Sequence, residues 1–325
     1  MGKETKLRPL CLLKILYEKT DEDHPLSSNE LIALMESEYG LYVYRTTIAA
    51  DVEQLKKFGM DIRTIKMASN QYYIGNRRFS LFELKLLIDA VESSKFITEG
   101  KSKELVGKLI ALASENKAFE LKRNLCIEGR IKPSNEQIYY IVDALNDAIN
   151  QGKKVSFQYF QYNVKKEQKL RHDGEIYIFS PYTLVWNGDY YYVIGFSDKH
   201  QSIGSFRVDR IFNQPKILRE NAVPCPKDFD EAKYVKTMFR MYNKEPQMVE
   251  LICDNDLMDA VIDKFGCDVK TYAYSMSAFK VEIELAASHV FYAWVFGFGG
   301  KVKILGPKNV KDEYAGMVKS AARDL

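Results

Sequence analysis

The stretch FSPYTLVWNGDYYYVIGFSDKHQSIGSFRVDRI, from Phe179 to Ile211, carries the densest run of strand and turn signals in the chain. Residues 180–186 are rich in aromatic and β-branched side chains and predict one strand, and residues 189–196 predict its partner. Asn187-Gly188 between them can both adopt positive φ, which predicts a hairpin that turns on these two residues. Residues 205–211 predict a third strand. The stretch therefore predicts a compact β-rich domain.

The order of these motifs resembles the WYL domain of bacterial regulators. Pro-Tyr-x-Leu, Asn-Gly, three tyrosines and Phe-Arg-Val-Asp-Arg-Ile follow one another from Pro181 to Ile211. The Trp-Tyr-Leu that names the family falls on residues 190–192, where Tyr191 is the one letter that this chain keeps. The resemblance implies an Sm-like or SH3-like barrel that senses a ligand through the tyrosine of the tripeptide and the arginines of the following strand.

The composition is that of a globular protein that works in water. The chain has 325 residues, more than one hydrophobic core usually holds, which predicts two or three domains. Its longest apolar run, residues 290–298, is too short to span a bilayer, and residues 1–9 lack the apolar core of a secretory signal. We therefore expect a cytoplasmic protein with no membrane contact. The formal net charge of +3 is small, so any binding of nucleic acid must rest on local basic patches.

Residues 1–78 predict three helices and a β-hairpin. Apolar residues at helical spacing from Leu10 to Tyr17 predict the first helix, and the capping box Ser27-Ser28-Asn29-Glu30 predicts the start of the second. A third predicted helix covers residues 45–58, and a hairpin follows over residues 62–74. This is the order of a winged helix-turn-helix. It resembles the domain that commonly accompanies WYL domains, whose recognition-helix pattern would fall on Arg45-Thr46-Thr47-Ile48 and Asp51-Val52-x-x-Leu55.

In the third predicted helix, Ile48, Val52 and Leu55 form an apolar stripe, so the opposite side faces away from the core. An α-helix fits the major groove of DNA, where a small side chain such as Ala50 allows close approach and can contact a thymine methyl group. The family often has an arginine at the position of Ala50. The alternative is a winged helix that contacts only proteins, and charge alone does not separate the two. The candidate DNA-binding residues are Arg45, Thr46, Thr47, Ala50, Lys56, Lys57, Arg63 and Lys66.

The whole chain is predicted to be a multidomain α+β protein. Ser80 begins a second capping box, which opens a helical middle section with a further helix over residues 103–113. We expect this section to help form a homodimer, because DNA operators usually have twofold symmetry. For the C-terminal part the resemblance implies a ferredoxin-like extension. The predicted segments are a winged helix-turn-helix (1–78), a helical linker or dimerisation region (79–134), the WYL domain (135–220), which opens on a helix capped by Ser134, and the extension (221–325).

The ligand site is predicted at Tyr159, Tyr191, Arg207 and Arg210. Tyrosine rings can stack on bases and arginine forks can bind phosphate, which together suit a nucleotide or a single strand of nucleic acid. Strand alternation places Arg207 and Arg210 on opposite faces, so both can join one site only if the strand ends or bulges near Asp209. The alternative is that Asp209 pairs locally with an arginine and that the tyrosines only pack.

No catalytic or metal-binding motif stands out. The chain has no Walker loop, no Gly-x-Ser-x-Gly elbow and no His-Glu-x-x-His, and its four histidines and five cysteines lack metal-ligand spacing. We therefore expect no enzyme activity, no cofactor and no metal. The basic run from Lys153 to Arg171 is interpreted as a solvated loop face, or alternatively as an extension of the anionic site.

Together these features predict a DNA-binding transcription regulator. Its partners would be a double-stranded operator and an effector that is a nucleotide or a single-stranded nucleic acid. The alternative function is a single-stranded nucleic-acid-binding accessory factor in defence or the DNA-damage response.

Overall fold

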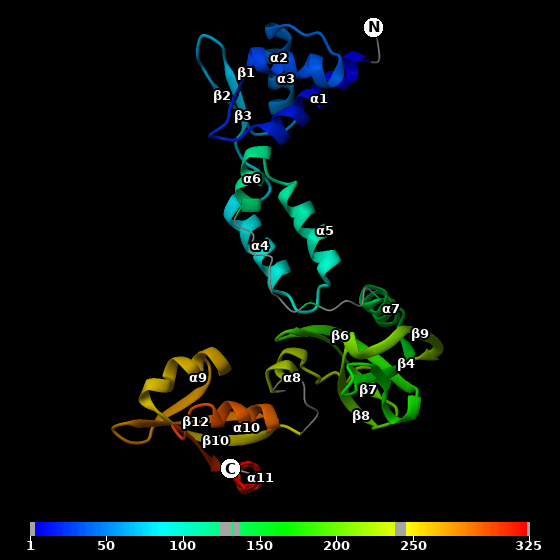
Figure 1. The fold of residues 1–325 in the computed structure, drawn as a ribbon, viewed down its shortest axis with the longest axis vertical. Coiled ribbons are helices and arrows are strands. Elements are labelled where there is room, and N and C mark those ends of the chain that lie inside the picture. Colours follow the sequence, from blue (N-terminus) through cyan, green and yellow to red (C-terminus); the bar gives the residue numbers. More distant parts are fainter. Residues whose placement is uncertain (1–3, 124–131, 133–136, 238–244, 324–325) are drawn as a thin grey trace. The chain divides into compact units, whose positions relative to one another are not determined.

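The computed structural model describes residues 4–123, 132, 137–237 and 245–323. The chain divides into two compact units, Met1–Ser134 and Asn135–Leu325, called here the N-terminal unit and the C-terminal unit. Helices and strands occur in both units, and the described strands form three antiparallel sheets (Figure 1). This confirms the prediction of a mixed α+β chain. The division into four segments stays a prediction.

Three helices and a three-stranded sheet form the first part of the N-terminal unit. Their apolar sides meet in one core, where Leu12 and Ile15 of the first helix and Ile48 of the third are fully buried. Leu10 lies outside this core and is 60% exposed, because the buried side of the first helix runs through Leu12 and Ile15 instead. The elements are α1 (Glu4–Lys19), β1 (Leu26–Ser27), α2 (Ser28–Tyr39), α3 (Arg45–Lys57), β2 (Ile62–Ile65) and β3 (Gln71–Ile74), with sheet order β1-β3-β2.

Local signals in the sequence account for the position of α2. The Ser27 hydroxyl accepts a hydrogen bond from the Glu30 N–H, and the Glu30 carboxylate accepts one from the Ser27 N–H at 2.7 Å. At the other end Gly40 adopts the left-handed conformation, with φ 67°. The predicted capping box and the glycine stop are both confirmed.

A buried ion pair ties α3 to α1. Asp51 of α3 is fully buried, and its carboxylate accepts hydrogen bonds from Nε and Nη2 of Arg8 at 2.6 and 3.0 Å. Together with the apolar stripe of α3, this pair determines which side of the helix faces outward.

Three further helices complete the N-terminal unit and share a second apolar core. α4 (Leu81–Ser93) opens with the predicted capping box of Ser80 and Glu83. α5 (Glu99–Ile110) begins at Thr98, whose hydroxyl accepts a hydrogen bond from the Lys101 N–H. α6 (Glu115–Arg123) was not predicted, because Leu121 is its one buried residue and it has no apolar repeat.

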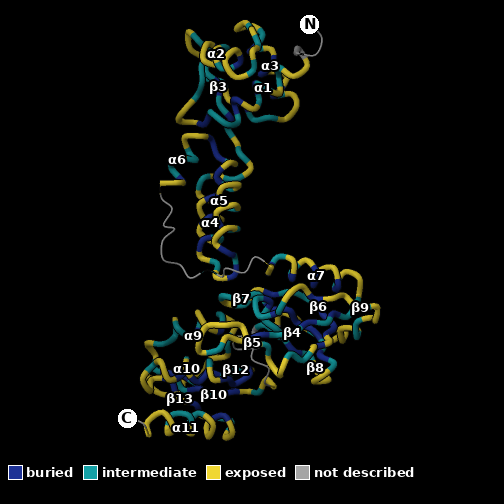
Figure 2. Tube along the Cα trace, turned by 45° about the vertical axis from the view of Figure 1, so that its right-hand side comes forward, coloured by how far each residue is buried: buried dark blue, intermediate teal, exposed yellow. Residues whose placement is uncertain are grey.

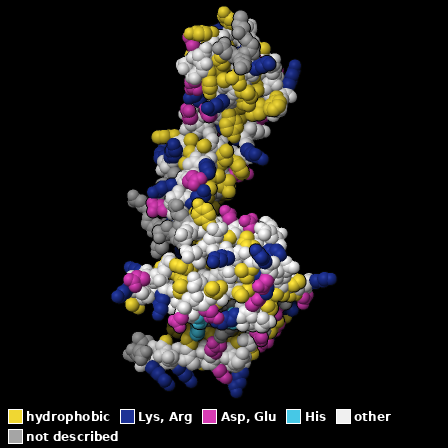
Figure 3. Space-filling model, turned by 90° about the vertical axis from the view of Figure 1, so that its right-hand side faces the viewer, with side chains coloured by type: hydrophobic (Ala, Val, Ile, Leu, Met, Phe, Trp, Pro, Cys, Tyr) yellow, Lys and Arg dark blue, Asp and Glu magenta, His cyan; other side chains and the backbone are white. Residues whose placement is uncertain are grey.

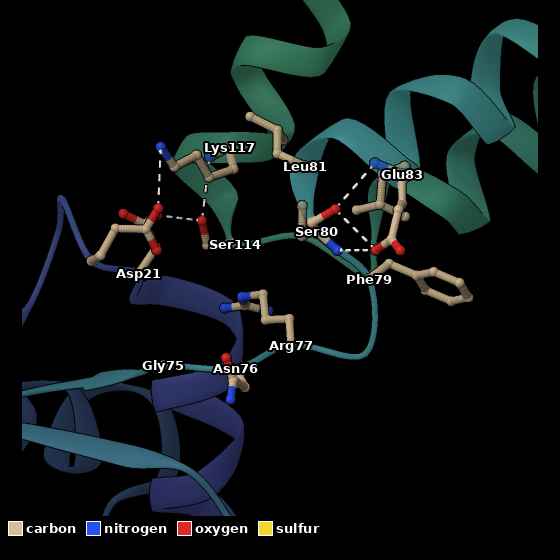
Figure 4. A pocket seen from close by; sticks show the side chains of 13 residues that line it. Asp21, Gly75, Asn76, Arg77, Phe79, Ser80, Leu81, Glu83, Ser114 and Lys117 are labelled. Atoms are coloured by element: carbon tan, nitrogen blue, oxygen red, sulfur yellow. Dashed lines mark hydrogen bonds and ion pairs between the residues drawn. The ribbon is translucent and has the colours of Figure 1, made fainter.

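Polar side chains join the two parts of the N-terminal unit. Asp21, which follows α1, accepts a hydrogen bond from the hydroxyl of Ser114, which precedes α6 (Figure 4). Arg77, between β3 and α4, donates to the backbone carbonyl oxygens of Thr20 at 2.8 Å and Leu112 at 3.4 Å. Asp21 is only 2% exposed, so this junction holds a buried carboxylate.

Acid is expected to weaken this junction. Burial raises the pKa of Asp21, but hydrogen bonds from Ser114 and His24 outweigh burial and hold the pKa below its ordinary value. A carboxyl group with a lowered pKa stabilises the fold above its ordinary pKa of about 4, and this contribution is lost as pH falls through the lower, folded value. Urea unfolding of the full chain at pH 5, 4 and 3, roughly spanning that window, measures the effect.

The control for this prediction is a matched pair of variants. In Asp21→Asn the free energy of unfolding of the N-terminal unit should be lower at the highest pH and should fall less with acid than in the native chain. Asp89→Asn changes an exposed carboxyl group on α4 and should keep the native pH dependence. Equal pH dependence in the native chain and Asp21→Asn would contradict the prediction.

A curved sheet forms the first part of the C-terminal unit. Three strands that follow one another in the chain form a meander. An earlier strand pairs on one side with the first strand of the meander and on the other side with the last strand of the sheet. Gly195 allows close packing of the strands, since a Cβ there would lie 2.1 Å from the Ser180 carbonyl oxygen. The elements are α7 (Ile138–Gln151), β4 (Lys153–Tyr162), β5 (Gln168–Leu170), β6 (Tyr177–Asn187), β7 (Tyr190–Ser197), β8 (Ser202–Arg207) and β9 (Ile211–Asn221); β4 pairs with β5, β6 and β9. The predicted cap at Ser134 lies outside the described residues.

Two predictions in this region are wrong in detail. Asn187 still pairs with Tyr190 in the sheet, so the hairpin turns on Gly188 and Asp189, and of the two predicted turn residues only Gly188 has a positive φ, 60°. The predicted third strand ends at Arg207, where a single 3-10 turn, Val208–Arg210, leads directly into β9. Because this turn of three residues joins the two outer strands β8 and β9, the sheet must curve strongly.

A second antiparallel sheet, of order β11-β12-β10-β13, completes the C-terminal unit. Leu251 and Val281 on its inner face are fully buried and belong to one core with Phe291. Figure 2 shows this core in dark blue. Most of the apolar run at residues 290–298 therefore lies in a helix, His289–Phe296, that packs on this core. No helix in the described part of the chain has the length and apolar character to cross a membrane. The elements are α8 (Glu231–Thr237), β10 (Gln247–Asp254), α9 (Met258–Phe265), β11 (Lys270–Ala273), β12 (Ala278–Leu285), α10 (His289–Phe296), β13 (Val302–Gly306) and α11 (Lys308–Ala322).

Candidate functional site

An open cavity of about 540 Å³ lies beside β7 and β8 of the curved sheet. Aromatic and arginine side chains share its wall, and no acidic residue other than Asp189 lines it among the described residues. Such a lining suits a flat anionic ligand, because rings can stack on it and guanidinium groups can bind its charge. The residues that the argument uses are Tyr159, Arg171, Tyr190, Tyr192, Ser205 and Arg207.

Arg207 occupies the end of β8, and its guanidinium is held between a tyrosine ring and a carboxylate. Its guanidinium carbon lies 3.3 Å from the centre of the Tyr190 ring. Its Nε and Nη2 donate to the two carboxylate oxygens of Asp209 at 3.0 and 2.7 Å. Burial lowers the pKa of Arg207, but the hydrogen bonds and charge of Asp209 raise it more, so the net pKa lies above its ordinary value. Arg207 is therefore a fixed cation on an aromatic ring.

Tyr159 of β4 positions Arg207. The phenol oxygen of Tyr159 accepts a hydrogen bond from the Arg207 backbone N–H at 3.2 Å. Burial raises the pKa of Tyr159 to about 12, so the phenol stays neutral at physiological pH. Its ring packs edge-on against Phe206, with ring centres 5.3 Å apart, and the guanidinium carbon of Arg171 lies 5.8 Å from the ring centre. Arg171 adds a second, exposed cation to the cavity.

Two of the predicted ligand residues lie elsewhere. Tyr191 points away from the cavity and packs against Trp186, with ring centres 5.7 Å apart. Arg210 lies in the 3-10 turn, with its guanidinium carbon 4.8 Å from the centre of the Tyr162 ring and its Nε 3.7 Å from Asp209. The early end of β8 thus brings Arg207 and Arg210 to one carboxylate, but Arg207 alone of the two lines the cavity.

Sequence reasoning missed Tyr190 and Tyr192, and it placed Arg171 near the ligand only in the alternative that the basic run extends the anionic site. The signal for the two tyrosines was present, since side chains alternate along a strand and residues 190 and 192 must share the face opposite Tyr191. In the sheet Tyr192 lies directly across from Arg207. The place of Arg171 follows from the turn Arg171–Gly174 between β5 and β6, which brings this end of the basic run to the cavity.

The outer side of α3 carries several of the predicted DNA-binding residues, whereas Arg63 lies on β2 and Lys66 follows it. Arg45, Thr46, Ala50 and Lys57 are exposed, and Thr47 is half-buried. The Arg45 Nε donates to the Asn29 side-chain oxygen on α2 at 2.8 Å, which holds the guanidinium beside the start of α3. The exposure of these residues confirms the predicted outward side of this helix.

The predicted phosphate-binding cations are in two different states. Lys56 is paired with Glu53 at 2.8 Å, and Arg63 is paired with Asp61 at 2.8 Å. Lys57 and Lys66 are exposed and form no ion pair among the described residues. On the face drawn in Figure 3, lysine and arginine side chains alternate with acidic ones instead of forming a single basic surface. On this face the positive charge is therefore local.

Residues 140–214 match the family model of the WYL domain. The chain contains a WYL domain. The match runs from α7 into β9 and includes the cavity residues Tyr159, Tyr190 and Arg207. Residues 249–322 match the WCX domain, which coincides with the second sheet of the C-terminal unit and its helices. No group of three or more metal-ligating side chains occurs in either domain within the described residues.

Two solved structures resemble the whole chain at low identity. One is the proteasome accessory factor B/C (PafBC) of Arthrobacter aurescens, with 17% identity, a TM-score of 0.30 and 98% of this chain covered. This chain spans 47% of the length of PafBC. The other is described as a CRISPR Cas-related protein, with 12% identity, a TM-score of 0.38, and 99% of this chain and 84% of that chain covered. No curated protein sequence matches the chain.

Proposed function

We propose that this WYL-domain protein is a cytoplasmic bacterial transcription regulator, in which the N-terminal unit binds duplex DNA and the WYL domain senses an anionic ligand. The observation that carries the proposal is the guanidinium of Arg207, stacked 3.3 Å from the centre of the Tyr190 ring at the wall of an open cavity. A cation on an aromatic face suits a nucleotide or a short single strand, which offers both phosphate and stacking rings. The protein has no enzymatic role in this proposal.

In this proposal the N-terminal unit is the DNA-binding part of the regulator. Three helices followed by a hairpin support a winged helix-turn-helix, and α3 is then the recognition helix. Its exposed side combines Arg45, which can bond base edges or phosphates, with Thr46 and Ala50, which allow close approach to the groove floor. Lys57 and Lys66 are available for phosphates, whereas Lys56 and Arg63 must first leave their carboxylate partners.

The sensor is a curved sheet whose outer strands are joined by one short turn, which supports the Sm-like barrel implied by the resemblance. Within it, Asp209 bonds Arg207 and also lies 3.7 Å from Arg210. An anion that reaches Arg207 therefore competes with Asp209, and the released carboxylate can pair more closely with Arg210. Ligand binding would change the ion pairing at the start of β9, and this differential contact is what a shift between two states requires.

The regulator is proposed to act as a homodimer. Ligand-induced repacking would alter the spacing of the two α3 helices and so the affinity for an operator with twofold symmetry. Light scattering of the full chain, free and on DNA, tests the oligomeric state, and a monomeric mass in both conditions would contradict it.

The DNA-binding role is tested with Arg45→Ala. We expect affinity for genomic fragments selected by the native chain to fall by about 1–3 kcal/mol, or roughly 5- to 150-fold, because a contact to base edges or phosphate is lost. Fluorescence anisotropy at physiological salt measures the change. Arg78→Ala removes an exposed arginine outside α3 and should leave affinity unchanged. If Arg45→Ala bound as tightly as the native chain, α3 would not be the reader.

One alternative function has its own support. The Arg207 and Tyr190 stack would also serve a protein whose main target is single-stranded nucleic acid, such as an accessory factor in defence or the DNA-damage response. Competition between unstructured oligonucleotides and selected duplexes separates the two. Tighter binding to the single strands than to any duplex would favour the accessory factor.

A further inference from the structure

The helix α4 carries apolar side chains on two opposite sides. One side includes Leu84 and Ile88, which are buried in the second core of the N-terminal unit. The other side includes Phe82 and Leu86, which lie one turn apart and are 69% and 52% exposed. A helix that is apolar on both sides normally packs against a partner on each of them. Within the described residues, the core covers only one of these two sides.

Two opposite charges lie next to Leu86 on the exposed side. Lys85 and Asp89 are four residues apart, so they share one face of the helix, and their charged atoms are 3.5 Å apart. Their side chains are 50% and 55% exposed, and an exposed pair of this kind contributes little to the stability of the helix. Each side chain can therefore pair with an opposite charge on another molecule at little cost.

These positions fit a second copy of the same helix that runs in the opposite direction. Lys85 of each copy faces Asp89 of the other when a twofold axis passes midway between them, at the height of residue 87. Residue 87 is also the midpoint of α4 (Leu81–Ser93), so the two helices would overlap along their whole length, about 20 Å. Leu86 then lies beside the axis and meets its own copy, and Phe82 meets the last turn of the partner helix.

A second exposed apolar face of the N-terminal unit does not fit such a pair. α1 exposes Leu7 and Leu10, at 56% and 60%, and also carries Lys14 and Glu18 four residues apart. An antiparallel pair that joined these two charges would place both leucines beyond the end of the partner helix, which stops at Lys19. Charge pairing and apolar contact therefore agree at α4 and conflict at α1.

We infer that α4 forms the dimer contact of this protein, with the exposed sides of two α4 helices packed antiparallel across a twofold axis. The inference rests on the proposed function, which requires a homodimer, and adds the surface that forms it. α4 belongs to the same compact unit as α3, so this contact sets the spacing of the two α3 helices.

The small size of this contact determines where the dimer is stable. One helix pair buries less than the roughly 800 Å² per partner of a standard interface, so free chains should associate weakly. An operator with two half-sites holds both copies together and strengthens the contact. Unfolding measured below the dissociation constant of the dimer reports the single chain and is insensitive to the contact.

The apolar part of the contact is tested with Leu86→Glu in the full chain. The dissociation constant of the dimer should rise by roughly 30- to 1000-fold, because two leucines lose their apolar contact and two glutamates meet at the axis. Sedimentation equilibrium over a range of protein concentrations measures this constant, and an unchanged Tm shows that the unit still folds. Leu10→Glu makes the same change at an exposed leucine of α1 and should dimerise as the native chain does.

The charged part is tested with Lys85→Glu and Asp89→Lys. Either change alone places like charges against each other in its own dimer and should weaken it. In a mixture of the two variants, each chain offers the charges that the other needs, so heterodimers should exceed the share that random pairing gives. Capture through a tag on one variant measures this share. Single variants that dimerise at native strength, or random pairing in the mixture, would exclude the antiparallel contact.

The outcomes separate this inference from the proposed function. A native chain that is monomeric both free and on DNA overturns the homodimer and this contact together. If the native chain and Leu86→Glu dimerise equally, the homodimer stands and the inference fails. If no duplex is bound but Leu86→Glu dissociates, the contact stands and the DNA-binding role fails. Arg45→Ala should lose duplex affinity and keep the native dissociation constant of the dimer, whereas Leu86→Glu should change both.

Discussion

The Arg207→Ala variant is expected to bind a single-stranded oligonucleotide about 30- to 1000-fold more weakly than the native chain, a loss of about 2–4 kcal/mol. Two effects add. The change removes the cation that is stacked on Tyr190, and it leaves Asp209 with Arg210 at 3.7 Å as its nearest guanidinium partner. A less neutralised carboxylate beside the cavity repels an anion. Fluorescence anisotropy with a labelled oligonucleotide of mixed sequence measures the affinity.

The controls for Arg207→Ala separate the loss of this site from the loss of one positive charge. Arg219→Ala removes the same charge from an exposed position on β9 and should bind the oligonucleotide normally. Asp209→Asn removes the internal competitor for Arg207, so its affinity should change in the opposite direction and increase. Binding by Arg207→Ala at native strength would exclude Arg207 from the ligand site, and weaker binding by Asp209→Asn would show that Asp209 does not compete with the ligand.

The Asp51→Ala variant is expected to lower the free energy of unfolding of the N-terminal unit by about 2–3 kcal/mol. Asp51 is fully buried and joins α3 to α1 through two hydrogen bonds from Arg8. Loss of one partner of a buried ion pair is strongly destabilising, but Arg8 is 24% exposed and can turn to water, which keeps the effect below that of a fully buried pair. The Tm of this unit should fall by about 10–20 °C. Urea and thermal unfolding of the full chain measure both quantities.

Two further variants make the Asp51 prediction specific. Glu53→Gln breaks an exposed ion pair with Lys56 on the same helix and should leave the Tm nearly unchanged. Arg8→Met combined with Asp51→Leu replaces the pair with apolar side chains, and such replacements often regain the lost stability. A native Tm in Asp51→Ala would mean that the ion pair contributes nothing to the position of α3.

Much of the fold follows from local signals in the sequence. The capping boxes at Ser27 and Ser80 and the glycine at residue 40 depend on hydrogen bonds within one helical turn, so they act wherever those residues occur. The apolar stripe of Ile48, Val52 and Leu55 likewise predicts the buried side of α3 from spacing alone. Two elements were not predicted, because their local signals are weak. α6 has one buried residue, and β9, which the sequence did not predict beyond Ile211, contains Pro215, which argues against a strand.

The ligand site was only partly predictable, because its geometry depends on where strands end. The strand pattern places residues 205–211 in one run, whereas the chain leaves the sheet at Arg207 and turns once before β9. That turn brings Arg207, Asp209 and Arg210 together. The choice between Tyr190 and Tyr191 also depends on which face of β7 meets the cavity, and alternation alone does not say which.

The sequence by itself determined the three helices and the hairpin of residues 1–78, the helix starts at Ser27 and Ser80 and the outward side of α3, because capping and periodicity act over a few neighbouring residues. Only the tertiary structure decided that Tyr190 and Arg171 line the cavity with Arg207, that Tyr191 does not, and that Asp51 pairs with Arg8. These contacts join residues that are far apart in the chain or lie on opposite faces of a strand. Their positions depend on the curvature of the sheet and the packing of helices, which no single stretch of the sequence specifies.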